Sequence, residues 1–269
     1  MRRIFDAFMF NNEYDILECR LYELEPVRNL THIIVEADVD HQDHPKPWNF
    51  EAHADRFERW ADRIIYVKAT GLPTFTADPD PWAREHAQRD HIWTGLEQAG
   101  ALDSDVLLQS DVDEIPRVLP ARNVDPTGIV AFGQRGHFFA VDWLYPDTWY
   151  GTTAARISTL RKMEPRAMCF MRDARMTAQC PPHLQDAGWH LSWLGGKHAQ
   201  QAKVGSFCHP EILKDGAVEQ WLDDDAFYRH GFHVDGKRMA PVDVDDSWPR
   251  WIRDGLAPAS WYRPREVAA

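Results

Sequence analysis

The sequence predicts an α/β protein whose sheet is mostly parallel and carries helices on its faces. In the first half of the chain, short apolar runs typical of buried strands alternate with segments of helical periodicity, as in a doubly wound sheet. Polar residues directly follow three of these runs, where a parallel sheet presents its ligand-binding edge. Of the 269 residues, 44% are apolar and 27% are charged, a composition typical of a folded domain.

Four apolar runs are the predicted strands of the parallel part, and they lie at residues 4–10, 32–36, 63–68 and 105–109. A helix is expected over 13–24, where apolar residues recur at helical spacing. A second helix is expected over about 82–98, after a loop of alternating Pro and Asp. A polar, proline-bearing loop is expected over 38–49.

The second half of the chain is less regular. Residues 128–143 predict β structure, and Gly188–Trp193 predicts a strand that ends at Gly195-Gly196. These glycines open a predicted helix that continues to about Phe207. A last helix is expected over 218–228 and irregular structure over 243–269, whereas 149–180 allow no firm assignment.

Charge and hydropathy exclude two classes of partner. The chain has 30 Lys and Arg against 42 Asp and Glu, a net charge of −12, which disfavours binding of nucleic acid through its phosphates. No run approaches the ~18 apolar residues that a membrane span requires. We therefore expect no nucleic-acid partner, no membrane span and, since no signal peptide is visible, a cytoplasmic location. The four cysteines form no C-x-x-C pair, so reduced thiols are expected, with a Cys169–Cys180 disulfide as the alternative.

An acidic motif, Asp111-Val112-Asp113-Glu114, directly follows the fourth predicted strand. Carboxylates this close repel one another, and a divalent cation such as Mg²⁺ or Mn²⁺ relieves that repulsion. On an extended backbone the side chains of Asp111 and Asp113 would point the same way. The motif therefore predicts a metal and diphosphate site, although acidic surface turns also contain this pattern.

A second group of residues surrounds the paired glycines. A helix that begins at Gly195-Gly196 would present its N-terminus to an anion. Lys203 in that helix could then reach a diphosphate, and His209 beyond it could bind the metal through a neutral imidazole. The alternatives are a surface lysine and a structural histidine.

Polar residues near the other strand ends are candidates for donor binding. Asn11 and Glu13 follow the first strand, and Glu36 ends the second. In the helix over 82–98, Arg84 or Arg89 is expected near the phosphates. Glu85 and Arg89 are spaced for an i,i+4 pair, which could equally be a surface pair that stabilises the helix.

Several segments together resemble glycosyltransferase family 17. The resemblance runs in the same order over about residues 4–211 and is carried by Asp6–Leu24, Ile34–Glu36, Lys46-Pro47, Asp111–Pro116 and Ala187–Trp193, with Lys203 downstream. The opening segment and Gly-Trp-His-Leu-Ser-Trp are its specific parts. The pattern around Ser206–Glu211 differs from that of the animal members.

The resemblance implies a GT-A fold and an inverting transfer from a nucleotide sugar, UDP-linked in the animal members, assisted by Mn²⁺ or Mg²⁺. It makes Asp111 and Asp113 the metal and diphosphate residues. N-acetylglucosamine, the sugar of the animal members, is one candidate, but the residues that shape the donor and acceptor sites are not recognisably retained, so the resemblance does not fix the sugar. The expected acceptor is a hydroxyl of a glycan or protein. We then expect one catalytic domain over 1–269, with 1–116 as the nucleotide-sugar half, 117–212 as the acceptor and metal half, and 213–269 as a packing extension.

An inverting transfer needs a base for the acceptor hydroxyl, and the candidates are Glu211, His190 and Glu114. Candidate aromatic platforms for sugar rings are Trp143, Trp149, Trp189 and Trp193, of which at least half are expected in the core. Two other functions stay open. One is a metal-dependent phosphohydrolase or nucleotidyltransferase, and the other is a non-catalytic carbohydrate-binding protein.

Overall fold

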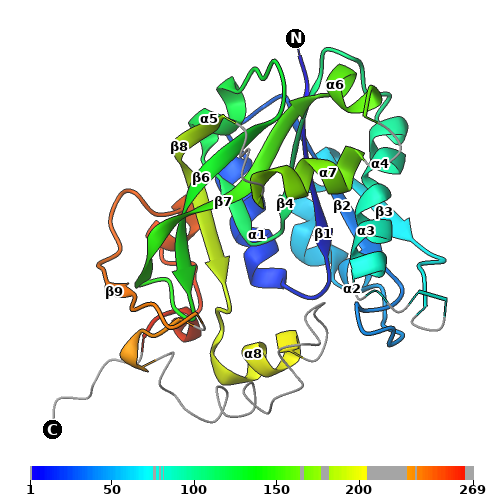
Figure 1. Ribbon diagram of the computed structural model, residues 1–269. Coiled ribbons are helices and arrows are strands. Elements are labelled where there is room, and N and C mark those ends of the chain that lie inside the picture. Colours follow the sequence, from blue (N-terminus) through cyan, green and yellow to red (C-terminus); the bar gives the residue numbers. More distant parts are fainter. Residues whose placement is uncertain are drawn as a thin grey trace, which may run out of the picture.

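A computed structural model describes residues 2–74, 77–78, 80, 82–163, 167–176, 182–204, 229–233 and 235–263. Within these residues, one mixed sheet forms the centre of the protein (Figure 1). Its strand order is β3-β2-β1-β4-β7-β6-β8-β5, and β9 pairs with β7. Strands from both halves of the sequence therefore share one sheet.

The first four strands form the parallel part. They are β1 (Ile4–Phe10), β2 (Leu30–Ala37), β3 (Ile64–Ala69) and β4 (Val106–Asp111). β1 lies in the middle and pairs in parallel with both β2 and β4, and β3 extends the sheet from β2. All four predicted strands are confirmed within two residues at each end.

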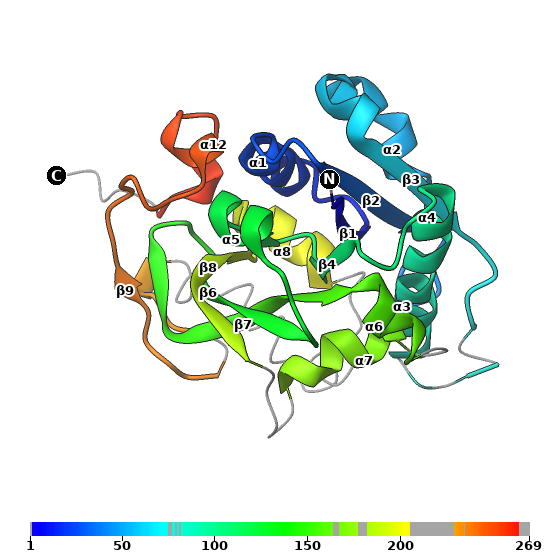
Figure 2. The same cartoon turned by 90° about the horizontal axis from the view of Figure 1, so that it is seen from above.

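Alternate side chains of β1 pack against opposite layers of helices, because successive residues of a strand point to opposite faces. Phe8 and Phe10 join a core with α1 (Tyr14–Leu24), whereas Phe5 and Ala7 join a core with α4 (Ile92–Gln98). Figure 2 shows α1, α2 (Asn49–Ala52) and α12 (Arg250–Arg253) on one face of the sheet. It shows α3 (Trp82–Asp90), α6 (Ile157–Arg161) and α7 (Ala167–Asp173) on the other.

The helix expected over 82–98 is two helices. α3 ends at Asp90 and α4 begins at Ile92. The backbone N–H of His91 donates to the carbonyl of Gln88, three residues back, which tightens the chain into a turn there. Gly95 then lets α4 approach the sheet, because a Cβ at this position would meet the side chain of Ile33 at 2.4 Å.

The second half of the sheet is largely antiparallel. It contains β5 (Glu114–Pro116), β6 (Val130–Phe138), β7 (Trp143–Arg156), β8 (His183–Ser192) and β9 (Ala240–Pro241). β7 runs antiparallel to β4 and β6, and β8 pairs in parallel with β6. β5 pairs with β8 at the far end of the strand order, although only two residues separate it from β4. The α/β class is confirmed, with its parallel strands in the first half and a β-rich second half.

Shorter elements complete the described chain. They are η1 (Ala54–Arg63), α5 (Val118–Asn123), η2 (Ala174–Met176), α8 (Gly196–Val204) and η3 (Ala259–Trp261). The segment 149–180, which had no assignment, supplies much of β7 together with α6 and α7. The expected helix over 218–228 lies outside the described residues. Cys19 and Cys169 are free and buried, and Cys180 and Cys208 also lie outside. Within the described ranges, no helix has the length and apolar character needed to cross a membrane.

Candidate active site

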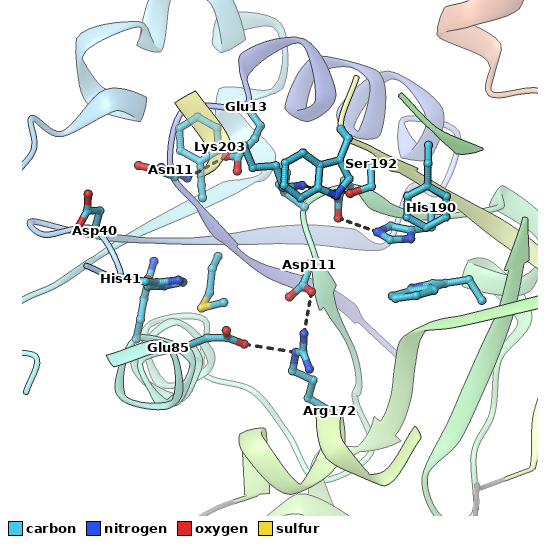
Figure 3. A pocket seen from close by; sticks show the side chains of 18 of the residues that line it. Asn11, Glu13, Asp40, His41, Glu85, Asp111, Arg172, His190, Ser192 and Lys203 are labelled. Atoms are coloured by element: carbon cyan, nitrogen blue, oxygen red, sulfur yellow. Dashed lines mark hydrogen bonds and ion pairs between the residues drawn. The ribbon is translucent and has the colours of Figure 1, made fainter. Parts of the chain in front are cut away.

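A cavity of about 400 Å³ opens where β1, β2, β4 and β8 end (Figure 3). The loops after these strands supply part of its wall, as expected at the carboxyl edge of parallel strands, and strands and helices supply the rest. The residues that line it are Met9, Phe10, Asn11, Glu13, Val39, Asp40, His41, Lys46, Glu85, Gln88, Asp111, Val112, Asp113, Phe138, Trp149, Arg172, His190, Ser192, Trp193, Lys203 and His233.

Asp111, the last residue of β4, lies among three arginines. Its carboxylate accepts hydrogen bonds from Arg89 at 2.9 Å and from Arg172 at 3.1 Å, and Arg175 lies 3.9 Å away. Burial alone would raise the pKa of Asp111, but the three guanidinium groups outweigh it and hold the pKa well below its usual range. About 31% of the side chain is exposed. Asp111 is therefore an ionised carboxylate that a ligand can reach.

Asp113 faces the same cavity with different partners. Lys203 donates to one carboxylate oxygen at 3.1 Å, and His190 Nε2 lies 3.6 Å from the other. The Lys203 ammonium also donates to Ser192 Oγ at 3.1 Å. Burial would raise the pKa of Asp113, but Lys203 and then His190 hold it well below its usual range. α8 thus brings Lys203 to the acidic motif.

The backbone of the acidic motif is a turn at Val112 and Asp113, whereas the sequence analysis assumed an extended segment. The carboxylates of Asp111 and Asp113 still line one cavity. The turn is stabilised from behind by Arg20 of α1. One guanidinium nitrogen of Arg20 lies within 3.2 Å of the carbonyl oxygens of Asp111, Val112 and Glu114 and donates to them.

Arg20 belongs to a sealed polar network beneath the site. Its guanidinium donates two hydrogen bonds to Asp6, at 2.6 and 2.9 Å, and a third to Ser110 Oγ at 2.7 Å. His32 Nδ1 contacts the same Asp6 carboxylate at 2.9 Å. Burial would raise the pKa of Asp6, but Arg20 and then His32 hold it well below its usual range. Sequence reasoning missed this network because its members are far apart in the chain.

Glu114 supports the site, and the prediction that it is a candidate base is wrong. Its carboxylate is fully buried and accepts hydrogen bonds from Trp149 Nε1 at 2.8 Å, Arg175 at 2.6 Å and the Asp111 backbone N–H at 2.9 Å. A carboxylate with these three donors and no exposed surface cannot meet an acceptor hydroxyl. It fixes the direction of Asp111 and the position of Trp149.

His190 is the candidate base that the structure places in the cavity. Its ring stacks on Trp149 with centroids 4.3 Å apart and an interplanar angle of 21°. The edge of Phe138 packs against it at 5.0 Å. Asp113 lies beside its Nε2, so an imidazolium formed there would be stabilised. Glu211 and His209 lie outside the described residues.

Glu36 is the clearest correction among the donor-binding candidates. Its buried carboxylate accepts bonds from Lys46 Nζ and Asn49 N–H, both at 2.6 Å, from Phe50 N–H at 3.0 Å and from Tyr66 OH at 2.8 Å. It therefore holds the start of α2 and does not reach a ligand. The position of Glu36 near the end of a strand did not predict that these partners would enclose its carboxylate.

The other donor-binding candidates differ in whether they reach the cavity or support the surrounding structure. Asn11 and Glu13 line the cavity, and Glu13 accepts the backbone N–H groups of Asn11 and Asn12 at 3.1 and 3.0 Å. Arg89 pairs with Glu85 at 2.7 Å as expected and also reaches Asp111. Arg84 is fully buried and donates to the carbonyls of His41 and Pro73, so it supports a loop. Of the two arginines expected near the phosphates, Arg89 is the one that reaches the acidic motif.

Two of the four candidate aromatic platforms are core residues. Trp189 and Trp143 are 2% and 6% exposed, whereas Trp149 and Trp193 line the cavity. Gly195 and Gly196 begin α8 with positive φ values of 97° and 75° but are not among the lining residues.

The lining residues that were not singled out from the sequence include His41, Gln88 and Arg172. Gln88 and Arg172 carry no local motif, and only the assembled fold reveals their position. For His41, the signal was available, since it follows β2 as Asn11 follows β1.

The acidic residues fit a divalent metal of the kind that nucleotide enzymes use. Asp111 and Asp113 offer carboxylate oxygens, the donors that Mg²⁺ and Mn²⁺ prefer. Across the described part of the chain, no three His, Cys, Asp or Glu side chains are grouped to hold an ion by themselves. The set fits an ion held by one or two carboxylates and completed by substrate phosphates.

Comparison with known proteins agrees with the resemblance. A rat (Rattus norvegicus) β-1,4-mannosyl-glycoprotein 4-β-N-acetylglucosaminyltransferase is 26% identical over 279 residues, covering 91% of this chain and 51% of that protein. The human (Homo sapiens) protein of that name is 25% identical over 222 residues, covering 71% and 40%. The chain thus spans about half the length of the relatives it matches.

Among solved structures, the mannosyltransferase PcManGT of Pyrobaculum calidifontis, in complex with GDP-Man and Mn²⁺, aligns with a TM-score of 0.42 and 14% identity. The alignment covers 82% of this chain and 70% of that one. Residues 1–220 match the sequence profile of glycosyltransferase family 17. Because that match takes in most of the chain, the protein belongs to glycosyltransferase family 17.

Proposed function

We propose that the chain transfers a sugar from a UDP-linked donor to a hydroxyl of a glycan or protein, with inversion and with the assistance of Mn²⁺ or Mg²⁺. One observation carries the proposal. Asp111 and Asp113 share a cavity with Lys203 and Arg172 at the carboxyl edge of the parallel strands. The names of the relatives support N-acetylglucosamine as the sugar.

We place the donor diphosphate at Asp111, between Arg172 and Lys203, two of the described cations that line the cavity. Arg172 and Lys203 have side chains 20% and 30% exposed. By contrast, Arg89 and Arg175 are almost completely buried against their carboxylates. Arg172 and Lys203 are therefore the cations available to a phosphate.

Charge balance supports metal dependence. Around the motif, the described carboxylates of Glu85, Asp111, Asp113 and Glu114 face the cations of Arg89, Arg172, Arg175 and Lys203, so negative and positive groups match in number. A diphosphate that entered alone would leave negative charge uncompensated in a partly buried site. A divalent ion held by Asp111 and Asp113 would compensate that charge and would act as a Lewis acid toward the leaving group.

The acceptor is placed on the His190 side of Asp111. The acceptor oxygen attacks the anomeric carbon from the face opposite the diphosphate, and the bond from that carbon to the diphosphate oxygen breaks. The hydroxyl proton passes to the His190 imidazole, and the electron pair leaves with UDP. Asp113 stabilises the resulting imidazolium, while Trp149 and Trp193 offer aromatic surface to a sugar ring.

Calorimetric titration of UDP and UDP-sugars tests the proposal without knowledge of the acceptor. Binding is expected with Mn²⁺ present and is expected to vanish with EDTA. Asp113→Asn should abolish binding and transfer but leave the fold intact. Asp103→Asn, an exposed acid whose side chain is 72% exposed, is the matched control and should bind as the wild type does.

Three results would contradict parts of the proposal. Equal UDP binding in EDTA removes the metal. Cleavage of the donor at its phosphoanhydride, independent of acceptor, indicates a phosphohydrolase. Binding of glycans but of no nucleotide indicates a carbohydrate-binding protein.

A further inference from the structure

The loop after β2 forms the wall of the cavity opposite His190. Figure 3 shows His41 on one side of Asp111 and His190 on the other. If the diphosphate lies at Asp111 and the acceptor on the side of His190, the nucleoside is left with the side of His41. The inference below therefore rests on the proposed function.

This loop is held in place by hydrogen bonds within the protein. The carboxylate of Asp40 accepts the backbone N–H groups of Gln42 and His44, at 2.8 and 2.9 Å. The buried Arg84 donates to the carbonyl of His41 at 2.9 Å. A side chain on such a loop can select among ligands, because little ordering is needed on binding.

Gln88 fixes the hydrogen-bonding role of the His41 ring. The side-chain nitrogen of Gln88 donates to the carbonyl of Val35 at 3.0 Å, and a carbonyl can only accept. The side-chain oxygen of Gln88 therefore faces His41 Nε2, at 3.1 Å, and Nε2 must carry the hydrogen. In the neutral ring, the lone pair is then on Nδ1. Among the described residues, Nδ1 has no hydrogen-bond partner.

We propose that His41 selects uracil by accepting the N3–H of the base at Nδ1. Uracil has a hydrogen on N3, whereas cytosine has a lone pair there. A ring nitrogen fixed as a hydrogen-bond acceptor attracts the N3–H of uracil and repels the N3 lone pair of cytosine. Gln88 is the positioning residue that keeps Nδ1 an acceptor.

Binding of UDP, CDP and UDP methylated at N3, measured by calorimetry with Mn²⁺, tests the assignment. The wild type is expected to bind UDP about tenfold more tightly than either other nucleotide, the value of one hydrogen bond whose loss leaves a polar group unpaired. His41→Phe keeps a ring of similar size and is expected to bind all three alike. His53→Ala, an exposed histidine outside the lining residues, is the control and should keep the wild-type preference.

The outcomes separate the two proposals. Equal wild-type affinity for UDP and N3-methyl-UDP overturns the role of His41 and leaves the transferase standing, as does an unchanged preference in His41→Phe. Binding of another nucleoside diphosphate in place of UDP overturns both the selection of uracil and the UDP part of the proposed donor, and leaves sugar transfer from a nucleotide sugar standing. Binding of no nucleoside diphosphate overturns the proposed function as well.

Discussion

Two networks of carboxylates and cations lie on opposite sides of the acidic turn and differ in their access to ligands. The one behind the turn contains Asp6 and Arg20, and both side chains are fully buried. The one in front contains Asp111 and Asp113, and each lines the cavity. Both hold ionised carboxylates with pKa values far below normal, so a depressed pKa does not identify the functional group. The difference in access teaches that the first network supports the turn and that the second is available for chemistry.

Removing Arg20 should give the largest effect on stability. Arg20→Met leaves the buried Asp6 carboxylate and three turn carbonyls without their shared donor. We expect the free energy of unfolding to fall by about 3–5 kcal/mol, measured by urea denaturation. Arg56→Met is the control, since Arg56 forms ion pairs with Asp15 and Glu18 near the surface, and it should cost about 1 kcal/mol or less. Equal losses in the two variants would show that the buried Arg20 network adds no more stability than a surface ion pair.

The buried His137 tests the comparison through the pH dependence of the free energy of unfolding. Burial lowers the pKa of His137 to about 4, whereas an unfolded chain titrates near 6.5. As the pH falls, the unfolded state takes up the proton first. The stability from this group is therefore complete above pH ~6.5 and is lost toward pH ~4, with a slope of up to about 1.4 kcal/mol per pH unit.

His137→Gln should remove that slope from urea denaturation curves measured between pH 7 and 4.5. The affinity for UDP at pH 7 should stay unchanged, because His137 is not among the lining residues. Parallel stability curves for the variant and the wild type would show that His137 does not control this pH dependence.

The smallest effect is expected from Trp149→Phe, which tests whether the acceptor lies on the His190 side of Asp111. Trp149→Phe keeps an aromatic ring on His190 but removes the hydrogen bond to Glu114. We expect a loss of about 1 kcal/mol in the free energy of unfolding and no change in the affinity for UDP. A tenfold weaker affinity for UDP would place Trp149 at the donor and contradict the division of the cavity.

The sequence predicted the strands and the acidic motif well because both depend on neighbouring residues. Apolar runs marked β1 to β4, and Asp111 and Asp113 face the cavity even though their backbone is a turn. The direction of a side chain is harder to predict when its partners are distant in sequence. Glu36 is enclosed by Lys46 and Tyr66, neither of which a local pattern connects to it.

The residues that sequence reasoning missed have the same explanation. Arg172 lies on a short helix in the segment that had no assignment, and its role depends on β4, far away in the chain. The place of His41 after β2 is a local signal, but the orientation of its ring depends on Gln88, 47 positions later. These pairs exist only once the strands and helices are assembled.

The strand order also makes the acidic turn a structural connection within the sheet. Starting at β4, the sheet passes through β7, β6 and β8 to β5, and β5 begins two residues after β4 ends. The turn thus directly connects β4 and β5, the two ends of this run of five neighbouring strands. Because only Val112 and Asp113 separate β4 from β5, a residue inserted there would shift the two strands relative to each other. This two-residue turn joins β4 of the parallel part to β5 of the second half, so a displacement of either strand would also displace Asp111 and Asp113.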